Sequence, residues 1–121
     1  VQDAAQTRRL LERLLELGCR AAVLTGLRVD GDMAVAALQR DGTGTLVRTS
    51  YIPEVFHGTG DLFASVIAGA LTRDKPLDRA IAIATEYTRL AMLNTVNCAT
   101  VPVYGVQLEQ TLGTLISMIS D

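Results

Sequence analysis

The residues with the clearest chemical potential are Gly58, Thr59, Gly60 and Asp61, which precede a run without charge that lasts until Arg73. Such an apolar run predicts a buried helix that begins at the glycine loop. A helix N-terminus exposes backbone N–H groups that lack partners and carries a partial positive charge. Glycines let the backbone approach an anion closely and adopt positive φ angles. The sequence therefore predicts an anion hole, with Asp61 beside it for proton chemistry.

A simpler interpretation of these residues stays open. Gly-x-Gly-Asp alone is a weak signal, and Asp61 at a helix N-terminus is explained by a stabilisation of roughly 0.3–1 kcal/mol. An ionisable group at the tip of a buried helix favours a functional site instead. His57 is the only histidine, so this chain provides no catalytic triad and no multi-histidine metal site. We expect His57 to be a packing residue or to lie at the rim of a phosphate site.

Two other phosphate-binding motifs do not fit. A Walker A loop needs Gly-x-x-x-x-Gly-Lys-[Ser/Thr], but the only lysine, Lys75, precedes Pro76. A dinucleotide fingerprint needs a third glycine at the position that Phe63 occupies. The sequence thus excludes the first class and disfavours the second.

The first half of the chain predicts one helix and three strands. Leucines at helical spacing predict a helix over 3–17 that stops at Gly18. The short apolar run 21–25 is typical of a strand buried on both faces, ending at Thr25-Gly26 in a parallel α/β layer. The turn signal at 40–44 predicts a β-hairpin with strands over 33–38 and 45–52, the second ended by Pro53.

The second half predicts helices. Residues 73–76 predict a break between two helices, the one that follows Asp61 and one over 77–93. Pro76 stands at a helix start, where proline is tolerated. A loop over 94–104 and a last helix over 107–119 complete the order α-β-β-β-α-α-α. Since a doubly buried strand needs further neighbours in its sheet, this order predicts additional sequence or a partner chain.

Composition limits the function classes. A chain of 121 residues with a net charge of −2 forms at most one domain and lacks the basic footprint of nucleic-acid binding. No apolar stretch approaches the roughly 18 residues of a membrane span. Cys19 and Cys98 have no metal-ligand spacing or disulfide framework, which suits buried thiols in a reducing cytoplasm.

The beginning of the chain indicates a fragment. Val1 stands where a methionine is expected, inside an apparently amphipathic segment, and 49% of the residues are hydrophobic. The mean hydropathy of +0.28 is high for a small domain. We expect residues 1–121 to be a single partial domain whose apolar surface is normally covered.

The run Phe56 to Ser65, with Gly-Thr-Gly-Asp-Leu-Phe at its centre, resembles the signature of the ribokinase-like superfamily, and of pyridoxal/pyridoxine/pyridoxamine kinases in particular. The segment Leu17 to Gly26 is similar to the strand that ends in Thr-Gly before their nucleotide site. Tyr104 to Glu109 resembles the start of their final helix. The resemblance covers essentially the whole chain, but only the C-terminal part of such a kinase. It implies a three-layer α/β/α sandwich.

The resemblance also implies ATP-dependent phosphorylation of a hydroxymethyl group, with Mg²⁺ and optionally a monovalent cation. Asp61 would be the base, and the backbone of Gly58, Thr59 and Gly60 would form the anion hole. The residues expected to border the nucleotide are Thr25, Gly26, Thr49, Ser50, Tyr51 and Ile52. Phosphoryl transfer has a loose transition state, so an ionised Asp that orients the hydroxyl is sufficient.

This chain departs from the family pattern in one respect. An Asn-x-x-Glu motif, which helps to organise Mg²⁺ in these kinases, does not occur in it, so the metal ligands stay unknown. The N-terminal portion that would enclose the substrate and supply a lid is also expected to lie elsewhere. Three hypotheses remain: a vitamin B6 kinase, another hydroxymethylpyrimidine or sugar kinase of the superfamily, and a non-catalytic nucleotide-binding or assembly module. The family also leads us to expect a cytoplasmic homodimer, or association with the N-terminal portion.

Overall fold

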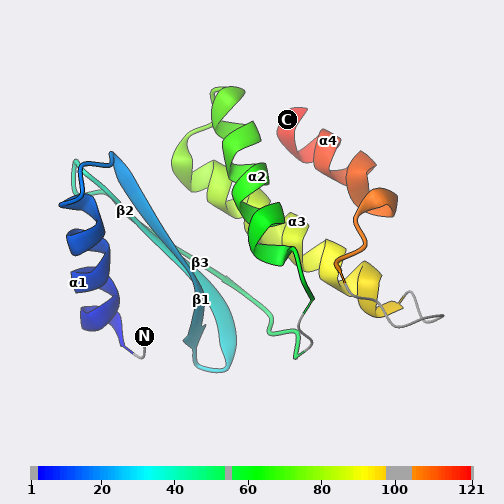
Figure 1. Cartoon of the computed structure of the whole chain (residues 1–121), viewed down its shortest axis with the longest axis horizontal. Coiled ribbons are helices and arrows are strands. Elements are labelled where there is room, and N and C mark those ends of the chain that lie inside the picture. The colour runs from blue at the N-terminus through cyan, green and yellow to red at the C-terminus, as the bar shows by residue number, and fades with distance from the viewer. Residues whose placement is uncertain (1–2, 54–55, 98–104, 121) are drawn as a thin grey trace. The chain divides into compact units, whose positions relative to one another are not determined.

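The computed structural model describes residues 3–53, 56–97 and 105–120 and divides into two compact units, Val1–Tyr51 and Ile52–Asp121 (Figure 1). The first unit contains α1 (Ala4–Leu15), β1 (Ala21–Val29), β2 (Asp32–Gln39) and β3 (Gly44–Thr49). The second contains α2 (Thr59–Thr72), α3 (Leu77–Asn97), the 3-10 turn η1 (Glu109–Thr111) and α4 (Leu112–Ser120). The predicted order of helices and strands is confirmed, with η1 added before the last helix.

The strands of the first unit form an antiparallel sheet in the order β1-β2-β3. β2 and β3 make the predicted hairpin, whose turn is held by a 2.9 Å hydrogen bond from the Thr43 N–H to Asp41 Oδ1. Gly42 lies in this turn at a φ of +94°, a conformation that favours glycine. The second strand ends at Thr49, not at Ile52, so Pro53 does not terminate it.

β1 differs from the prediction in length, partner and burial. It continues to Val29 and pairs antiparallel with β2, so the described residues show no parallel layer. Thr25 and Gly26 lie at a register shift in the middle of the strand, and both are exposed. Gly26 adopts a φ of +74°, which explains how the chain bulges there and continues instead of ending. The prediction of a doubly buried strand ending at Thr25-Gly26 was therefore wrong.

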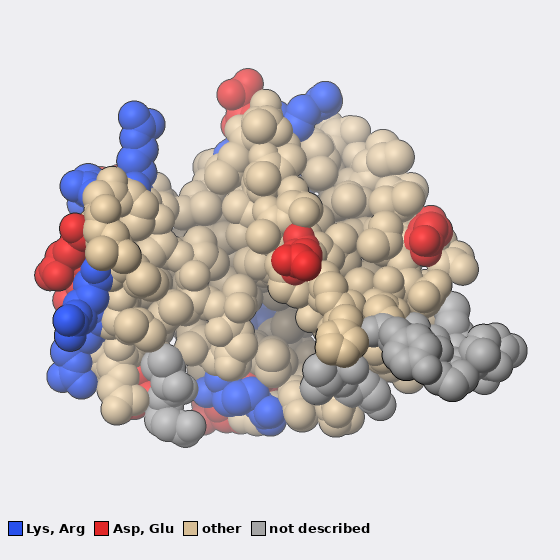
Figure 2. Space-filling model, in the orientation of Figure 1, with Lys and Arg blue, Asp and Glu red and all other residues tan. Residues whose placement is uncertain are grey.

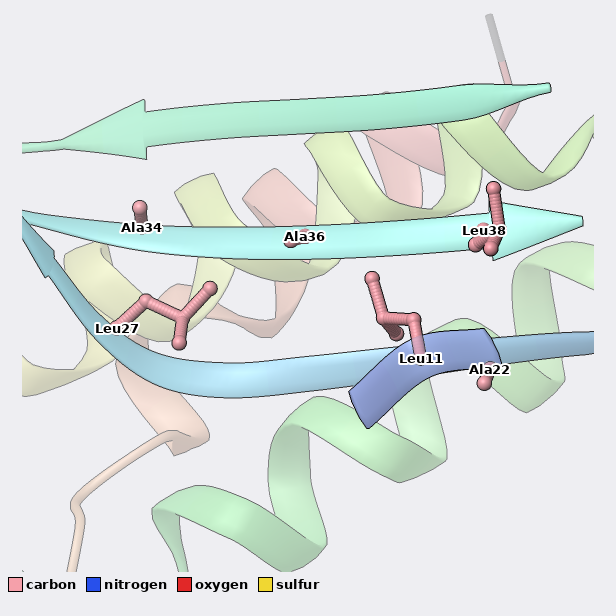
Figure 3. Packing of buried hydrophobic residues seen from close by; sticks show 6 residues of the cluster. All are labelled: Leu11, Ala22, Leu27, Ala34, Ala36 and Leu38. Carbon is pink, nitrogen blue, oxygen red and sulfur yellow. The ribbon is translucent and has the colours of Figure 1, made fainter. Parts of the chain in front are cut away.

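The core of the first unit lies between α1 and one face of the sheet (Figure 3). Its buried members come from α1, β1 and β2 and are Leu11, Ala22, Leu27, Ala34, Ala36 and Leu38. Alternate residues of β2 contribute because side chains alternate between the faces of a strand. The alanines of β2 are small, which lets α1 pack closely against the strands.

Both ends of α1 are capped by polar groups. Asp3 Oδ1 accepts a 2.7 Å hydrogen bond from the N–H of Gln6. At the other end the Arg40 guanidinium donates to the carbonyl oxygens of Cys19, at 2.7 Å, and Leu15, at 3.2 Å. α1 ends at Leu15 with Glu16 as its C-cap, two residues earlier than predicted, and Gly18, at a φ of +107°, lies in the turn that follows.

In the second unit α2 packs on α3, and the break at 73–76 is confirmed. The backbone N–H groups of Asp74 and Lys75 donate to the carbonyls of Leu71 and Ala70, which closes the end of α2. The sequence predicts a buried helix here, but only one stripe of α2 is buried, formed by Phe63, Val66 and Ala70.

α3 extends to Asn97, so residues 94–97 are helical and not the predicted loop; residues 98–104 lie outside the described ranges. The last predicted helix begins later than expected, with η1 and then α4 at Leu112. Cys19 is exposed, contrary to the expected buried thiol, because it lies in the turn after Gly18; Cys98 is not among the described residues. No helix in the described ranges combines the length and apolar character needed to cross a bilayer.

Candidate active site

The glycine loop, residues 58–60, leads into α2 with a left-handed backbone conformation at its first residue. Gly58 is the N-cap of α2, with φ and ψ of 91° and −3°. The first hydrogen bond of the helix runs from the Leu62 N–H to the Gly58 carbonyl, at 2.9 Å. A side chain at Gly58 would be strained by this conformation rather than by crowding, since an added Cβ would lie 3.8 Å from Val106 Cγ1. The glycine is therefore required by the backbone.

Three backbone N–H groups at the start of α2 are available for a ligand. Those of Thr59, Gly60 and Asp61 have no acceptor among the described residues, as expected of the first turn of a helix. Asp61 is exposed in that turn and is the one acidic residue there. Its carboxylate has no hydrogen-bond or ion-pair partner within the described residues. Unpaired N–H groups favour an anion and a free carboxylate can accept a proton, so the two features of the predicted site lie in one helical turn.

The glycine loop is fixed from behind by the segment at 105–106. The Val106 N–H donates to the His57 carbonyl at 3.1 Å, and His57 forms a parallel β-bridge with Gly105. The Thr59 hydroxyl adds a 3.4 Å hydrogen bond to the Phe56 carbonyl. The contribution of His57 seen here is made by its backbone, and its side chain is exposed.

A polar network ties the same segment to α3. The buried Thr95 hydroxyl accepts a 2.6 Å hydrogen bond from the Gln107 N–H, and Asn94 Nδ2 donates to the Gln107 carbonyl at 3.1 Å. The Tyr87 hydroxyl donates to the Leu108 carbonyl at 3.3 Å. Sequence reasoning did not identify these supporting residues. The sequence signal that could have identified Tyr87, Asn94 and Thr95 was the presence of these polar side chains among the apolar residues of the segment that forms α3.

In the first unit, the residues expected to border a nucleotide lie on the two outer strands of the sheet or directly after the last one. Thr25 and Gly26 form the bulge of β1, Thr49 is the last residue of β3, and Ser50 and Tyr51 follow it. Ile52 begins the second unit. Thr49 pairs with Met33 of β2. Three of these residues thus belong to the sheet, on strands that β2 separates, and Ser50 and Tyr51 follow its last strand.

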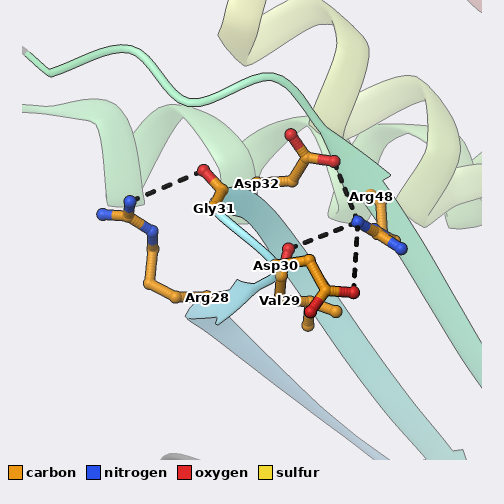
Figure 4. Close-up of polar contacts among 6 residues, drawn as sticks. All are labelled: Arg28, Val29, Asp30, Gly31, Asp32 and Arg48. Atoms are coloured by element: carbon orange, nitrogen blue, oxygen red, sulfur yellow. Dashed lines mark hydrogen bonds and ion pairs between the residues drawn. The ribbon is translucent and has the colours of Figure 1, made fainter.

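An arginine that the sequence analysis did not single out accompanies Tyr51. The Cζ atom of Arg28 lies 3.6 Å from the centroid of the Tyr51 ring, a close cation–π stack. A second arginine, Arg48, bonds to the carboxylate of Asp32 at 3.0 Å and lies 4.0 Å from that of Asp30 (Figure 4). The two arginines flank the turn between β1 and β2.

The described residues do not form a metal centre. Nowhere in the described ranges do three His, Cys, Asp or Glu side chains gather in a way that could hold a metal ion. On the face that Figure 2 shows, charged side chains gather over α1 and are fewer over the second unit. Asp61 is the single charged residue of α2.

The comparisons with solved structures give close matches to this fold. A putative phosphomethylpyrimidine kinase from Bacteroides thetaiotaomicron matches with a TM-score of 0.89 and 26% identity over 96% of this chain and 41% of its own. Pyridoxal kinase from Lactobacillus plantarum matches with a TM-score of 0.74 and 28% identity over 81% and 36%. Pyridoxal kinase from Entamoeba histolytica shares the fold, with a TM-score of 0.82, at 16% identity over 98% and 42%.

The chain thus spans about two fifths of the length of these structures. No protein of curated function matches it. The family model described as phosphomethylpyrimidine kinase matches residues 1–103, most of the chain. These matches confirm the ribokinase-like resemblance and the mixed α/β fold class, as part of a larger kinase fold. The chain belongs to the phosphomethylpyrimidine kinase family of the ribokinase-like superfamily.

Proposed function

We propose that this chain supplies the anion hole and the base of an ATP-dependent phosphotransferase that acts on a hydroxymethyl group. The observation that carries the proposal is the N-terminus of α2, where Gly58 turns the chain so that three unpaired N–H groups and the free carboxylate of Asp61 share one helical turn. Family membership and the kinase neighbours support it.

The roles of the residues follow from charge. ATP supplies the phosphoryl group, whose transfer spreads negative charge over three oxygens. The backbone N–H groups of the predicted anion hole, Gly58, Thr59 and Gly60, offset that charge together with the N–H of Asp61. The partial positive charge at the start of the helix adds to their effect. The Asp61 carboxylate accepts the hydrogen bond of the substrate hydroxyl and takes its proton as the new O–P bond forms.

The remaining parts of the site come from other segments. Thr25, Gly26, Thr49, Ser50, Tyr51 and Ile52 are proposed to border the nucleotide. Mg²⁺ has no ligand cluster among the described residues, so no step is assigned to it here. A cytoplasmic location and assembly as a homodimer, or with an N-terminal portion of the kinase, are likewise part of the proposal.

Two substrate classes have specific support. The solved structures named pyridoxal kinase favour a vitamin B6 vitamer, and one crystal form of the Bacteroides protein, which matches with 26% identity, contains pyridoxal. The family description favours a hydroxymethylpyrimidine instead. Turnover of the full-length protein with pyridoxal, pyridoxamine, hydroxymethylpyrimidine and ribose separates these classes, because the acceptor with the highest kcat/KM identifies the branch.

Substitution of Asp61 tests the mechanism. Asp61→Asn in the full-length protein should lower kcat by about 10²–10⁴-fold, because the general base is lost, while the KM for ATP changes little. The carboxylate has no hydrogen-bond or ion-pair partner among the described residues, so the free energy of unfolding should fall by no more than the roughly 0.3–1 kcal/mol of its interaction with the helix N-terminus. Asp74→Asn is the matched control, since it removes the same charge at the other end of α2 from an exposed residue whose positive φ, +61°, asparagine tolerates.

Near-normal turnover by Asp61→Asn would remove Asp61 from the mechanism. The competing function, a nucleotide-binding or assembly module, predicts that the wild-type protein transfers no phosphate to any of the four acceptors. ATP-induced thermal shifts and light scattering after size exclusion then decide between a nucleotide-binding and a purely assembling role.

A further inference from the structure

The stack of Arg28 on Tyr51 has no evident role in the packing of the first unit. Both residues are outside the buried core, and Tyr51 is 42% exposed. The guanidinium covers one face of the ring at 3.6 Å. An exposed aromatic ring is a platform for another planar group, because π systems stack favourably in offset arrangements.

Arg28 keeps a positive charge that its neighbours do not neutralise. Figure 4 shows the carboxylates of Asp30 and Asp32 directed at Arg48, whereas Arg28 lies on the other side of the turn. The one hydrogen bond recorded for Arg28 goes to the Gly31 carbonyl at 3.5 Å, the limit for such a contact. No described carboxylate lies within 4.0 Å of its guanidinium. This cation is therefore held mainly by the Tyr51 ring.

The register of the sheet places the pair among the residues expected to border a nucleotide. Arg28 pairs with Met33, which pairs with Thr49, so the three side chains lie in one row on one face. Tyr51 follows Thr49 by two residues. Arg28 itself follows the Thr25-Gly26 bulge. The strand that carries Thr25 and Gly26 contributes Arg28 to the stack, and the segment that begins at Thr49 contributes Tyr51.

We propose that Tyr51 stacks on the purine base of the nucleoside triphosphate and that Arg28 is a positioning residue that holds the ring from its other face. This inference rests on the proposed function and adds the element that binds the base of the phosphoryl donor. Stacking on an aromatic side chain suits every base, because each has a π face. The guanidinium limits the motion of a ring that is otherwise exposed at the end of a strand.

Kinetics of the full-length protein test the stack. Tyr51→Leu should raise the KM for ATP about tenfold, the effect of a base-stacking contact of ordinary strength. Tyr51→Phe should restore the wild-type value, since the ring is kept. Arg28→Gln should raise the KM roughly threefold, as loss of an exposed cation–π contact implies. The kcat and the KM for the acceptor should not change, and Arg48→Gln is the control for loss of an arginine at the same turn.

A double-mutant cycle separates positioning from direct contact with phosphate. If Arg28 acts through the ring, Arg28→Gln adds nothing in the Tyr51→Leu background. If Arg28 binds the triphosphate, the two effects multiply, and Arg28→Gln also weakens inhibition by inorganic tripolyphosphate. Adenosine, which has no phosphate, should lose affinity in Tyr51→Leu, whereas tripolyphosphate should inhibit this variant and the wild type equally.

An unchanged KM for ATP in Tyr51→Leu, with an active wild-type enzyme, overturns this inference and leaves the proposed function intact. The stack would then stabilise the end of the hairpin, and the variant would show only a lower melting temperature. An active wild type whose turnover is unaffected by Asp61→Asn overturns the proposed mechanism instead. If calorimetry shows no binding of ATP or adenosine to the wild-type protein, both proposals fail.

Discussion

Gly60→Ala is the substitution that best separates what the fold requires from what the chemistry requires. Gly60 is a helical residue of α2 without a positive φ, and a Cβ added there would meet no atom within 4 Å. Alanine is favoured over glycine within a helix by about 0.5–1 kcal/mol. The fold thus gives no reason for glycine at this position. Close approach of a phosphoryl group to the backbone N–H does give one.

Gly60→Ala is expected to increase stability and to decrease activity. Gly60→Ala should raise the free energy of unfolding by about 0.5 kcal/mol, the lower end of the range because the first turn of a helix is less sensitive. It should lower kcat/KM by about 100-fold, the cost of losing one preorganised donor to the transferring group. Gly69→Ala is the matched control, since Gly69 lies in the same helix and its Cβ would also meet nothing within 4 Å.

Urea unfolding and steady-state kinetics of the full-length protein provide both measurements. Gly69→Ala should be stabilised by a similar amount and retain wild-type kcat/KM. The reasoning is refuted if Gly60→Ala is as active as the wild type, because an anion hole built on this N–H has no room for a methyl group beside it. Equal losses in both variants would show that rigidity of α2, and not access to its N-terminus, limits turnover.

Three further predictions concern stability. Arg40→Gln should lower the free energy of unfolding by about 1–2 kcal/mol in urea denaturation, because the carbonyls of Leu15, at the end of α1, and Cys19, in the turn after it, lose a charged donor; a variant as stable as the wild type would show that water replaces the guanidinium. Tyr87→Phe should cost about 1 kcal/mol in the same assay, since the fully buried hydroxyl holds the segment before η1, and no loss would argue against that bond. Hydrogen bonds from Arg89 hold the pKa of Glu86 below its ordinary value of 4.5, so their stabilisation is present above pH 4.5 and disappears as the pH falls through the lower pKa of the folded state. Arg89→Gln should flatten the stability profile in that acidic range, and an unchanged profile would assign the acid sensitivity to other carboxylates.

Local signals in the sequence were sufficient for several elements. Gly18 lies in the turn that follows α1, the residues at 40–44 form the hairpin turn, and Gly58 is the N-cap of α2. Glycine marks these positions because it adopts positive φ angles without strain. The same reasoning failed for β1, which the sequence predicts to end at Gly26. Gly26 also has a positive φ, but within an antiparallel ladder this makes a bulge, and β1 continues to Val29.

Burial was the other property that the pattern predicted poorly. The apolar run of α2 predicts a buried helix, yet in the described structure its buried residues form one stripe, as they do in a helix with a single packed side. Cys19 was expected to be buried because free cysteines usually are. Its position in the turn after Gly18 exposes it, and its Sγ contacts the Leu14 carbonyl at 3.3 Å instead. Residue type alone does not say which side of an element meets a neighbour.

The geometry of the candidate anion hole depends on contacts that no local motif contains. The Gly-x-Gly-Asp sequence specifies that the backbone can turn at Gly58, but Val106, far along the chain, fixes that turn by its bond to the His57 carbonyl. The position of Val106 is in turn set by the bond between Gln107 and the buried Thr95. A left-handed turn held only by its own residues would sample other conformations, and the N–H groups beyond it would not be preorganised for an anion. The motif therefore identifies the chemistry, whereas the fit between α3 and the segment at 105–107 provides the rigidity that such chemistry needs.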